Sequence, residues 1–221
     1  MLKVVVFDSG YGGEIFADRL KEELPTIEVI RVIAWRDAEK VVASSRSARI
    51  VALESLRPYI GKVDLIIITN YLISLTSLRF LERKFQNQKF LGFELKAPDT
   101  FKDNRNLILS TTALSRTLKF HYFNTRLKQP YRVLNLDAWP GLIDDGELTA
   151  VKIKEDLSLF LIKNSDFVPN NLILANSQFT DIRRELQSAF SHHIRIYDSF
   201  DDTLRQTCKL LHIRGGIGKK S

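Results

Sequence analysis

A short run near the start of the sequence carries the side chains best suited to chemistry. Residues 4–7 are the apolar Val-Val-Val-Phe, and Asp8, Ser9 and three glycines within residues 10–13 follow at once. The pattern predicts a buried parallel strand that ends in a tight turn and leads into a helix. Glycine lets a ligand approach the main chain, and the free N–H groups at a helix start attract anions. Asp8 and Ser9 would therefore lie at the carboxyl end of a strand, where open α/β sheets bind ligands.

Two further interpretations of this turn are possible. It can be a plain strand-to-helix connection in which Asp8 or Ser9 caps the helix and binds nothing else. It can also be a degenerate dinucleotide-binding fingerprint, but we discount this because the required spacing G-x-G-x-x-G is absent. The sequence therefore leaves an anion site and a purely structural turn as the two alternatives.

Small polar residues recur at three further points where an apolar run ends. Because the carboxyl ends of parallel strands meet at one edge of a sheet, these corners are expected to approach one another. Two similar halves facing each other across a cleft would bring all of them together. The residues at the three corners are Thr69, Asn70 and Tyr71, then Thr111 and Thr112, and finally Asn176, Ser177 and Gln178.

Apolar runs alternate with amphipathic segments along the chain, so the sequence predicts an α/β fold with parallel sheets and right-handed crossovers. Residues 35–40 are expected to form a charged connection, residues 139–141 a turn, and residues 215–221 a mobile tail. Further strands are expected at 28–34, 63–68, 89–93, 106–110, 131–136, 171–174 and 194–197, and helices at 14–23, 43–56, 74–84, 113–123, 147–162, 181–190 and 201–211.

Composition narrows the class of protein. The single cysteine, Cys208, excludes an internal disulfide framework and a cysteine-rich zinc site. No apolar run is long enough to span a bilayer, and Met1 leads straight into the first strand, so we expect no membrane segment, no signal peptide and a cytoplasmic location. The net charge of +7 suits nucleic acid or a small dianion, but a charged soluble surface explains it equally.

The motifs together resemble the glutamate racemase family, in the wider aspartate/glutamate racemase group, over nearly the whole chain. Residues 6–13, VFDSGYGG, match the family's opening signature almost letter for letter. Residues 64–70, DLIIITN, are similar to the strand that leads to the family's Cys-Asn-Thr motif. Further similar segments are 109–120, LSTTALSRTLKF, at the threonine-rich corner, the acidic-glycine turn at 142–146, residues 172–179, LILANSQF, and the Asp-Ser element at 196–199.

The resemblance implies two similar Rossmann-like (flavodoxin-like) domains, residues 1–92 with 200–221 and residues 93–199, with the site in the cleft between them. It implies no metal and no cofactor. In the family, one cysteine thiolate removes the α-proton and a second thiol returns a proton from the opposite face. The resemblance assigns Asp8 and the positions of Thr69 and Asn176 to catalysis, and assigns substrate binding to Ser9, Asn70, Tyr71, Thr111, Ser177 and Gln178.

This sequence departs from the family at the catalytic positions. Thr69 and Asn176 occupy the two cysteine positions, and Gln178 occupies that of the helper histidine. A threonine hydroxyl and an asparagine amide are not proton-transfer groups near neutral pH. Cys208 lies at neither motif and is expected to pack inside a helix. Tyr71 stands where the family has a small threonine and could crowd the pocket, and the family's Pro-Tyr-Gly loop is missing near residues 40–42.

Other chemistry has less support in the sequence. His121, His192 and His193 lack zinc-ligand spacing. Asp144, Asp145 and Glu147 can form a paired-carboxylate site, although an acidic turn before a helix explains them as well.

Three functions therefore remain open. The chain can be a glutamate racemase-like protein without cysteine racemase activity that keeps a site for a small acidic amino acid or dicarboxylate. It can be an active glutamate or aspartate racemase or isomerase that uses Asp8 with a water molecule or Tyr71. It can also be an interaction protein. A nucleic acid or a nucleic-acid enzyme as its partner has only the basic charge as support. A homodimer is compatible with each.

Overall fold

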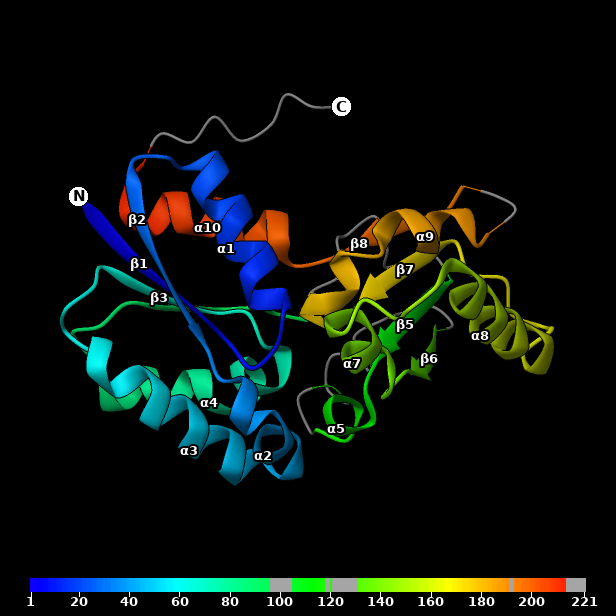
Figure 1. Ribbon diagram of the computed structural model, residues 1–221, viewed down its shortest axis with the longest axis horizontal. Coiled ribbons are helices and arrows are strands. Elements are labelled where there is room, and N and C mark those ends of the chain that lie inside the picture. Colours follow the sequence, from blue (N-terminus) through cyan, green and yellow to red (C-terminus); the bar gives the residue numbers. More distant parts are fainter. Residues whose placement is uncertain (96–104, 118–119, 121–130, 191–192, 214–221) are drawn as a thin grey trace. The chain divides into compact units, whose positions relative to one another are not determined.

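The computed structural model describes residues 1–95, 105–117, 120, 131–190 and 193–213. The chain divides into two compact units, one made of Met1–Glu94 with Ser199–Ser221 and the other of Leu95–Asp198 (Figure 1). Each unit is built on a four-stranded parallel sheet, which confirms the predicted α/β class. None of the helices within the described ranges has the length and apolar character that crossing a bilayer requires.

The sheet of the first unit is organised around a central strand, β1, in the order β2-β1-β3-β4. Residues 4–8 of β1 are fully buried, as the apolar run predicts. Phe7 of β1 lies opposite Ile68 of β3, so the next residues along the two strands, Asp8 and Thr69, emerge at the same edge. The strands are β1 (Leu2–Asp8), β2 (Ile27–Ile33), β3 (Leu65–Ile68) and β4 (Phe90–Gly92).

Helices from both ends of the sequence pack in this first unit. The rings of Phe16, Phe93 and Phe200 lie 5.2 Å apart in each pairing, and two of the three contacts are edge-to-face. Phe200 begins the last helix, so the end of the described chain belongs to the core of the first unit. The helices are α1 (Gly12–Glu23), α2 (Ala38–Ala43), α3 (Ser45–Leu56), α4 (Tyr71–Lys84) and α10 (Phe200–Leu211).

The second unit repeats the topology, because its strand order β6-β5-β7-β8 again places the first strand between the second and the third. Leu107 of the central strand lies opposite Arg132 and Leu172 of its neighbours. The strands are β5 (Asn106–Ser110), β6 (Tyr131–Asn135), β7 (Asn171–Leu174) and β8 (Arg195–Tyr197). The helices are α5 (Thr112–Ser115), α7 (Trp139–Asp144), α8 (Ala150–Lys163) and α9 (Arg183–Ser188).

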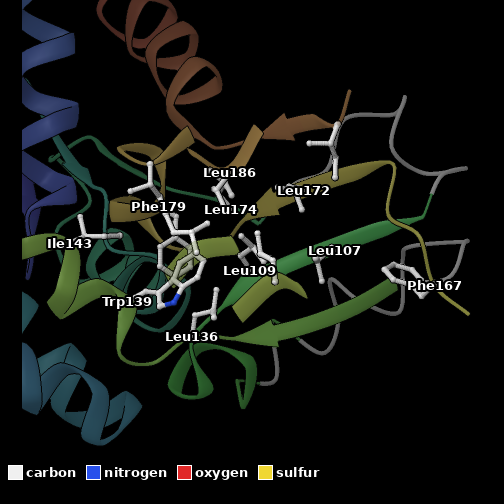
Figure 2. Close-up of a cluster of buried hydrophobic side chains, with 14 residues drawn as sticks. Leu107, Leu109, Leu136, Trp139, Ile143, Phe167, Leu172, Leu174, Phe179 and Leu186 are labelled. Carbon is white, nitrogen blue, oxygen red and sulfur yellow. The ribbon is translucent and has the colours of Figure 1, made fainter. Parts of the chain in front are cut away.

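Trp139 anchors the core of the second unit (Figure 2). Its ring centroid lies 5.9 Å from that of Phe179, and both side chains are buried among leucines of β5 and β7. Its indole Nε1 donates a hydrogen bond of 2.9 Å to Asp156 of α8, which also accepts one from Lys152 at 2.8 Å. This polar contact fixes α8 against the core.

The contact at Asp156 predicts a stability that depends on pH. Burial raises the pKa of Asp156, but hydrogen bonds from Lys152 and Trp139 outweigh it and hold the pKa below its ordinary value. A carboxylate whose pKa is lower in the folded than in the unfolded state stabilises the fold at pH values above its unfolded-state pKa. This stabilisation is lost as the pH falls through the folded-state pKa. Asp156→Asn is expected to lower the free energy of unfolding by about 1 kcal/mol at pH 7. In urea unfolding, the difference in unfolding free energy between the wild type and the variant should shrink when the pH falls below the ordinary aspartate pKa of about 4. A difference as large there as at pH 7 would contradict the prediction.

Several element boundaries differ from the sequence prediction. Residues 35–40, expected to be a connection, form a 3-10 helix (Trp35–Asp37) and the first half of α2. The expected turn at 139–141 is the start of α7, since a proline in the first helical turn needs no N–H partner. Helix α4 begins at Tyr71 rather than at 74, and α8 begins at Ala150 rather than at 147. The expected helix at 113–123 and the tail at 215–221 lie partly or wholly outside the described residues.

Candidate functional site

Asp8 and Thr69 form the centre of a polar cluster at the carboxyl edge of the first sheet. Thr69 N donates to Phe7 O at 3.0 Å, which continues the β1–β3 ladder by one residue. The Thr69 hydroxyl then donates to Asp8 Oδ2 at 2.7 Å. Asp8 is 1% exposed and Thr69 is 0% exposed, so this contact is closed to bulk solvent.

The second oxygen of the Asp8 carboxylate is held by the turn that follows it. Asp8 Oδ1 accepts from Ser9 N at 2.7 Å and from Gly10 N at 3.2 Å. Asn70 Nδ2 also approaches this oxygen, at 3.3 Å. Hydrogen bonds of this kind stabilise the ionised form of a carboxylate. The glycine-rich turn therefore wraps its N–H groups around Asp8.

Asn70 forms hydrogen bonds both within the polar cluster and with the helix that follows. Its Oδ1 accepts from Ile73 N at 3.0 Å and so caps α4, while its Nδ2 donates to Ser9 Oγ at 2.9 Å. The one side chain of Asn70 therefore both caps a helix and takes part in the polar network. The network connects all four polar residues at the ends of β1 and β3.

Gly13 lets α1 approach this cluster closely. A Cβ atom at Gly13 would lie 2.4 Å from Asp8 Cβ and 2.9 Å from Ile33 Cδ1. Asp8 cannot retreat, because its carboxylate is hydrogen-bonded on the side of β3. Gly13→Ala is expected to lower the free energy of unfolding by about 1–3 kcal/mol. In chemical denaturation Gly141→Ala, whose Cβ would meet nothing within 4 Å, is the matched control and should retain wild-type stability; equal losses would contradict the argument.

Tyr71 engages a different group from the Asp8 cluster. It is 4% exposed, and its hydroxyl donates to Ser199 Oγ at 2.8 Å and accepts from Ser199 N at 3.2 Å. Ser199 Oγ in turn donates to Glu94 O at 2.7 Å. Tyr71 therefore connects the two points at which the chain leaves and re-enters the first unit, and its role in substrate binding stays a prediction.

In the second unit, the predicted residues lie at the ends of β5 and β7. Thr111 caps α5 through its side chain, which accepts from Leu114 N at 3.4 Å. Asn176 follows β7 and caps the 3-10 helix Ser177–Thr180, because its Oδ1 accepts from Gln178 N at 2.8 Å. Ser177 is buried at the start of that helix.

Gln178 is held by a carboxylate of α7. Its Nε2 donates to both oxygens of Asp144 at 2.9 Å, and to Pro140 O at 3.4 Å. The acidic-glycine turn is thus in direct contact with the position to which the resemblance assigns a helper histidine. With its N–H groups used in this way, the amide of Gln178 presents its oxygen as an acceptor.

Sequence reasoning missed Asp137 in this unit. Its carboxylate accepts from Thr112 N at 2.7 Å and from the Thr112 hydroxyl at 2.5 Å. Asp137 directly follows the expected strand 131–136, as Asp8 follows the run 4–7, although residues 131–136 also include Arg132 and Asn135. The second sheet therefore carries its own carboxylate–hydroxyl pair at the strand ends.

Other reactive groups lie apart from these clusters. Cys208 is buried in α10, and burial raises the pKa of its thiol, which keeps it protonated at neutral pH. Within the described part of the chain no three His, Cys, Asp or Glu side chains gather as metal ligands. His193 is exposed, and His121 and His192 lie outside the described residues.

Comparison with known proteins shows which solved structures have the same fold. No protein-family model matches the chain, and no curated protein matches its sequence. Among solved structures, glutamate racemase from Escherichia coli, in complex with L-glutamate and the activator UDP-MurNAc-Ala, matches with a TM-score of 0.82 at 20% identity, over 100% of this chain and 86% of that chain. The Campylobacter jejuni glutamate racemase matches with a TM-score of 0.78 at 18% identity, over 100% and 89% of the two chains.

Aspartate racemase from Picrophilus torridus matches at a lower TM-score of 0.65 and 13% identity, over 97% of this chain and 95% of that one. The chain therefore has the two-domain fold of the glutamate racemases, and the resemblance read from its motifs is confirmed at the level of the fold.

Proposed function

We propose that this chain is a glutamate racemase-like protein without cysteine-based racemase activity, and that it binds a small acidic amino acid or dicarboxylate. The observation that carries the proposal is the hydrogen bond of 2.7 Å from the Thr69 hydroxyl to Asp8. It lies at the strand end to which the resemblance assigns a catalytic cysteine. At this position a buried hydroxyl that donates a hydrogen bond to a carboxylate stands in place of the thiol.

Neither of the two strand-end residues offers reversible proton transfer at a carbon atom. An aliphatic hydroxyl such as that of Thr69 is not ionised near neutral pH, and the amide of Asn176 neither gains nor loses a proton there. Acid–base catalysis at a carbon atom needs a base and an acid whose pKa values lie near the pH at which the enzyme works. The two replacements therefore support the loss of the thiol mechanism.

Neutral hydrogen-bond donors remain at the same strand ends. The Ser9 hydroxyl accepts from Asn70 at 2.9 Å and keeps its own proton to donate. The Thr111 hydroxyl, which accepts from a backbone N–H of α5 at 3.4 Å, does the same. Asn176 uses its Oδ1 for the Gln178 N–H, which leaves its N–H groups for a ligand. Such donors form charge-assisted hydrogen bonds with carboxylates, and the E. coli racemase of the same fold is in complex with L-glutamate.

An active racemase or isomerase that uses Asp8 as its base is the competing function. Asp8 is 1% exposed, and its oxygens already accept hydrogen bonds from the turn and from Thr69. A general base has to reach the proton that it abstracts. This closed environment supports the binding function over the catalytic one.

A racemase assay tests the proposal. The purified chain is incubated with D- and L-glutamate and with D- and L-aspartate, and the enantiomers are separated by chiral chromatography, with a cysteine-dependent glutamate racemase as the positive control. The proposal predicts interconversion no faster than in buffer alone. Turnover clearly above buffer that disappears in Asp8→Ala would show an active enzyme instead.

A further inference from the structure

Helices α3 and α4 carry a group of basic side chains without acidic partners. Some exposed cations elsewhere in the first unit are paired with carboxylates, as in Lys3–Glu28, Arg31–Asp18 and Arg205–Asp202. Others, such as Lys21, Arg36 and Lys62, form no ion pair with a described residue, so what distinguishes α3 and α4 is that their cations are grouped. Among the described residues, no carboxylate forms an ion pair with any of the five exposed cations of α3 and α4. These five residues, which we call the α3–α4 face, are Arg46, Arg49, Arg79, Arg83 and Lys84.

The five cations belong to one surface, because the two helices lie side by side (Figure 1). The Arg49 guanidinium of α3 donates to Thr76 O of α4 at 3.3 Å. It also lies 4.9 Å from the centre of the Phe80 ring, and Lys84 Nζ lies 5.8 Å from the same centre. Charges from both helices thus converge on a single aromatic side chain. Residues three or four apart share a helix face, so the remaining arginines extend this patch along each helix.

Little negative charge opposes this patch. The acidic residues of the two helices are Glu54 and Glu82. The pKa of Lys40 in α2 is raised mainly by its hydrogen bond to Asp37, and Glu54 adds a smaller attraction. Five cations on the two helices therefore face only two acidic residues of the same helices. The α3–α4 face retains an excess of positive charge.

We propose that the α3–α4 face binds the phosphate backbone of nucleic acid. Four of its five cations are arginines, whose planar guanidinium groups match phosphate oxygens in pairs. Unpaired cations displace counterions from a polyanion without first breaking an internal ion pair. A membrane surface fits less well, because an interfacial helix needs an exposed apolar face and Ile50 is the one large apolar side chain exposed on the described α3 and α4.

Fluorescence anisotropy with a short labelled duplex DNA of mixed sequence tests the proposal. The full chain is titrated between about 50 and about 200 mM salt, where non-specific affinities of about 10⁻⁴–10⁻⁶ M are measurable. The variant Arg46→Gln/Arg79→Gln/Arg83→Gln removes three exposed charges that form no hydrogen bond or ion pair with the described residues. We expect it to bind at least about tenfold more weakly at low salt. The slope of log affinity against log salt should flatten by about 2–3, since each phosphate contact contributes about 0.9.

The matched control is Lys154→Gln/Lys163→Gln/Arg184→Gln, which removes three exposed cations of the second unit and lowers the net charge equally. It should retain the wild-type affinity and slope, and circular dichroism should show both variants folded. Three results would overturn the proposal. They are a wild-type chain that does not bind the duplex, a control variant that loses as much affinity as the test variant, and tighter binding to phosphatidylserine vesicles than to DNA.

Discussion

Asp8→Ala is expected to lower the free energy of unfolding by about 3–5 kcal/mol, as measured by urea denaturation. The substitution removes the acceptor for the N–H groups of Ser9 and Gly10 and for the Thr69 hydroxyl, all of which are buried. The Thr69 hydroxyl still has Phe7 O within 3.2 Å, so the loss comes mainly from the two N–H groups. Each buried donor left without a partner costs about 1–3 kcal/mol. The effect on stability is large because one carboxylate accepts hydrogen bonds both from the turn after β1 and from the end of β3.

Asp18→Ala is the matched control for this prediction. Asp18 also pairs with a cation, Arg31, but the side chain of Asp18 is 58% exposed. Exposed ion pairs contribute about 0–1 kcal/mol, so this variant should stay close to the wild type. Equal losses of stability in the two aspartate variants would contradict the structural role of the Asp8 cluster.

A small dicarboxylate is expected to stabilise the folded chain strongly. A ligand that binds only the native state raises the free energy of unfolding by about 4 kcal/mol at 1,000 times its Kd. Thermal-shift measurements with L-glutamate, D-glutamate, L-aspartate and succinate should therefore raise the melting temperature with concentration. The uncharged diamide of succinate should not, because the proposed donors at the strand ends bind carboxylate oxygens.

Two variants locate this stabilisation. Ser9→Ala removes a hydroxyl donor at the end of β1 and should abolish most of the dicarboxylate shift. Because the substitution also removes the acceptor for Asn70 Nδ2, the shift is measured against the melting temperature of the same variant without ligand. Ser158→Ala removes an exposed hydroxyl from α8 and should keep the full shift. A shift that is the same for acid and diamide, or that survives in Ser9→Ala, would place the effect outside the proposed site.

Local sequence patterns predict the strand ends well. The run 4–7 and the run 63–68 are apolar and short, so each was expected to be a buried strand with polar residues beyond it. The structure places Asp8 and Thr69 side by side because the two strands are parallel neighbours in register. The prediction needed only the sheet rule that carboxyl ends share an edge.

Contacts between distant segments were beyond that kind of reasoning. The hydroxyl of Tyr71 donates to Ser199 Oγ, 128 residues away, and nothing local to either residue indicates this pairing. Gln178 meets Asp144 across 34 residues only because α7 and a 3-10 helix approach each other in the folded unit. Such pairs depend on how elements pack, whereas periodicity describes one element at a time.

Solvent deuterium exchange tests the central claim most directly, since every racemase or isomerase of this type must break the bond between the α-carbon and its hydrogen. The chain is incubated in deuterated buffer with each enantiomer of glutamate and aspartate, and loss of the α-proton signal is followed by NMR. We predict exchange at the rate of the protein-free control for all four compounds, with stabilisation by the same compounds in thermal-shift measurements. Exchange that exceeds the control and disappears in Asp8→Ala would contradict the account.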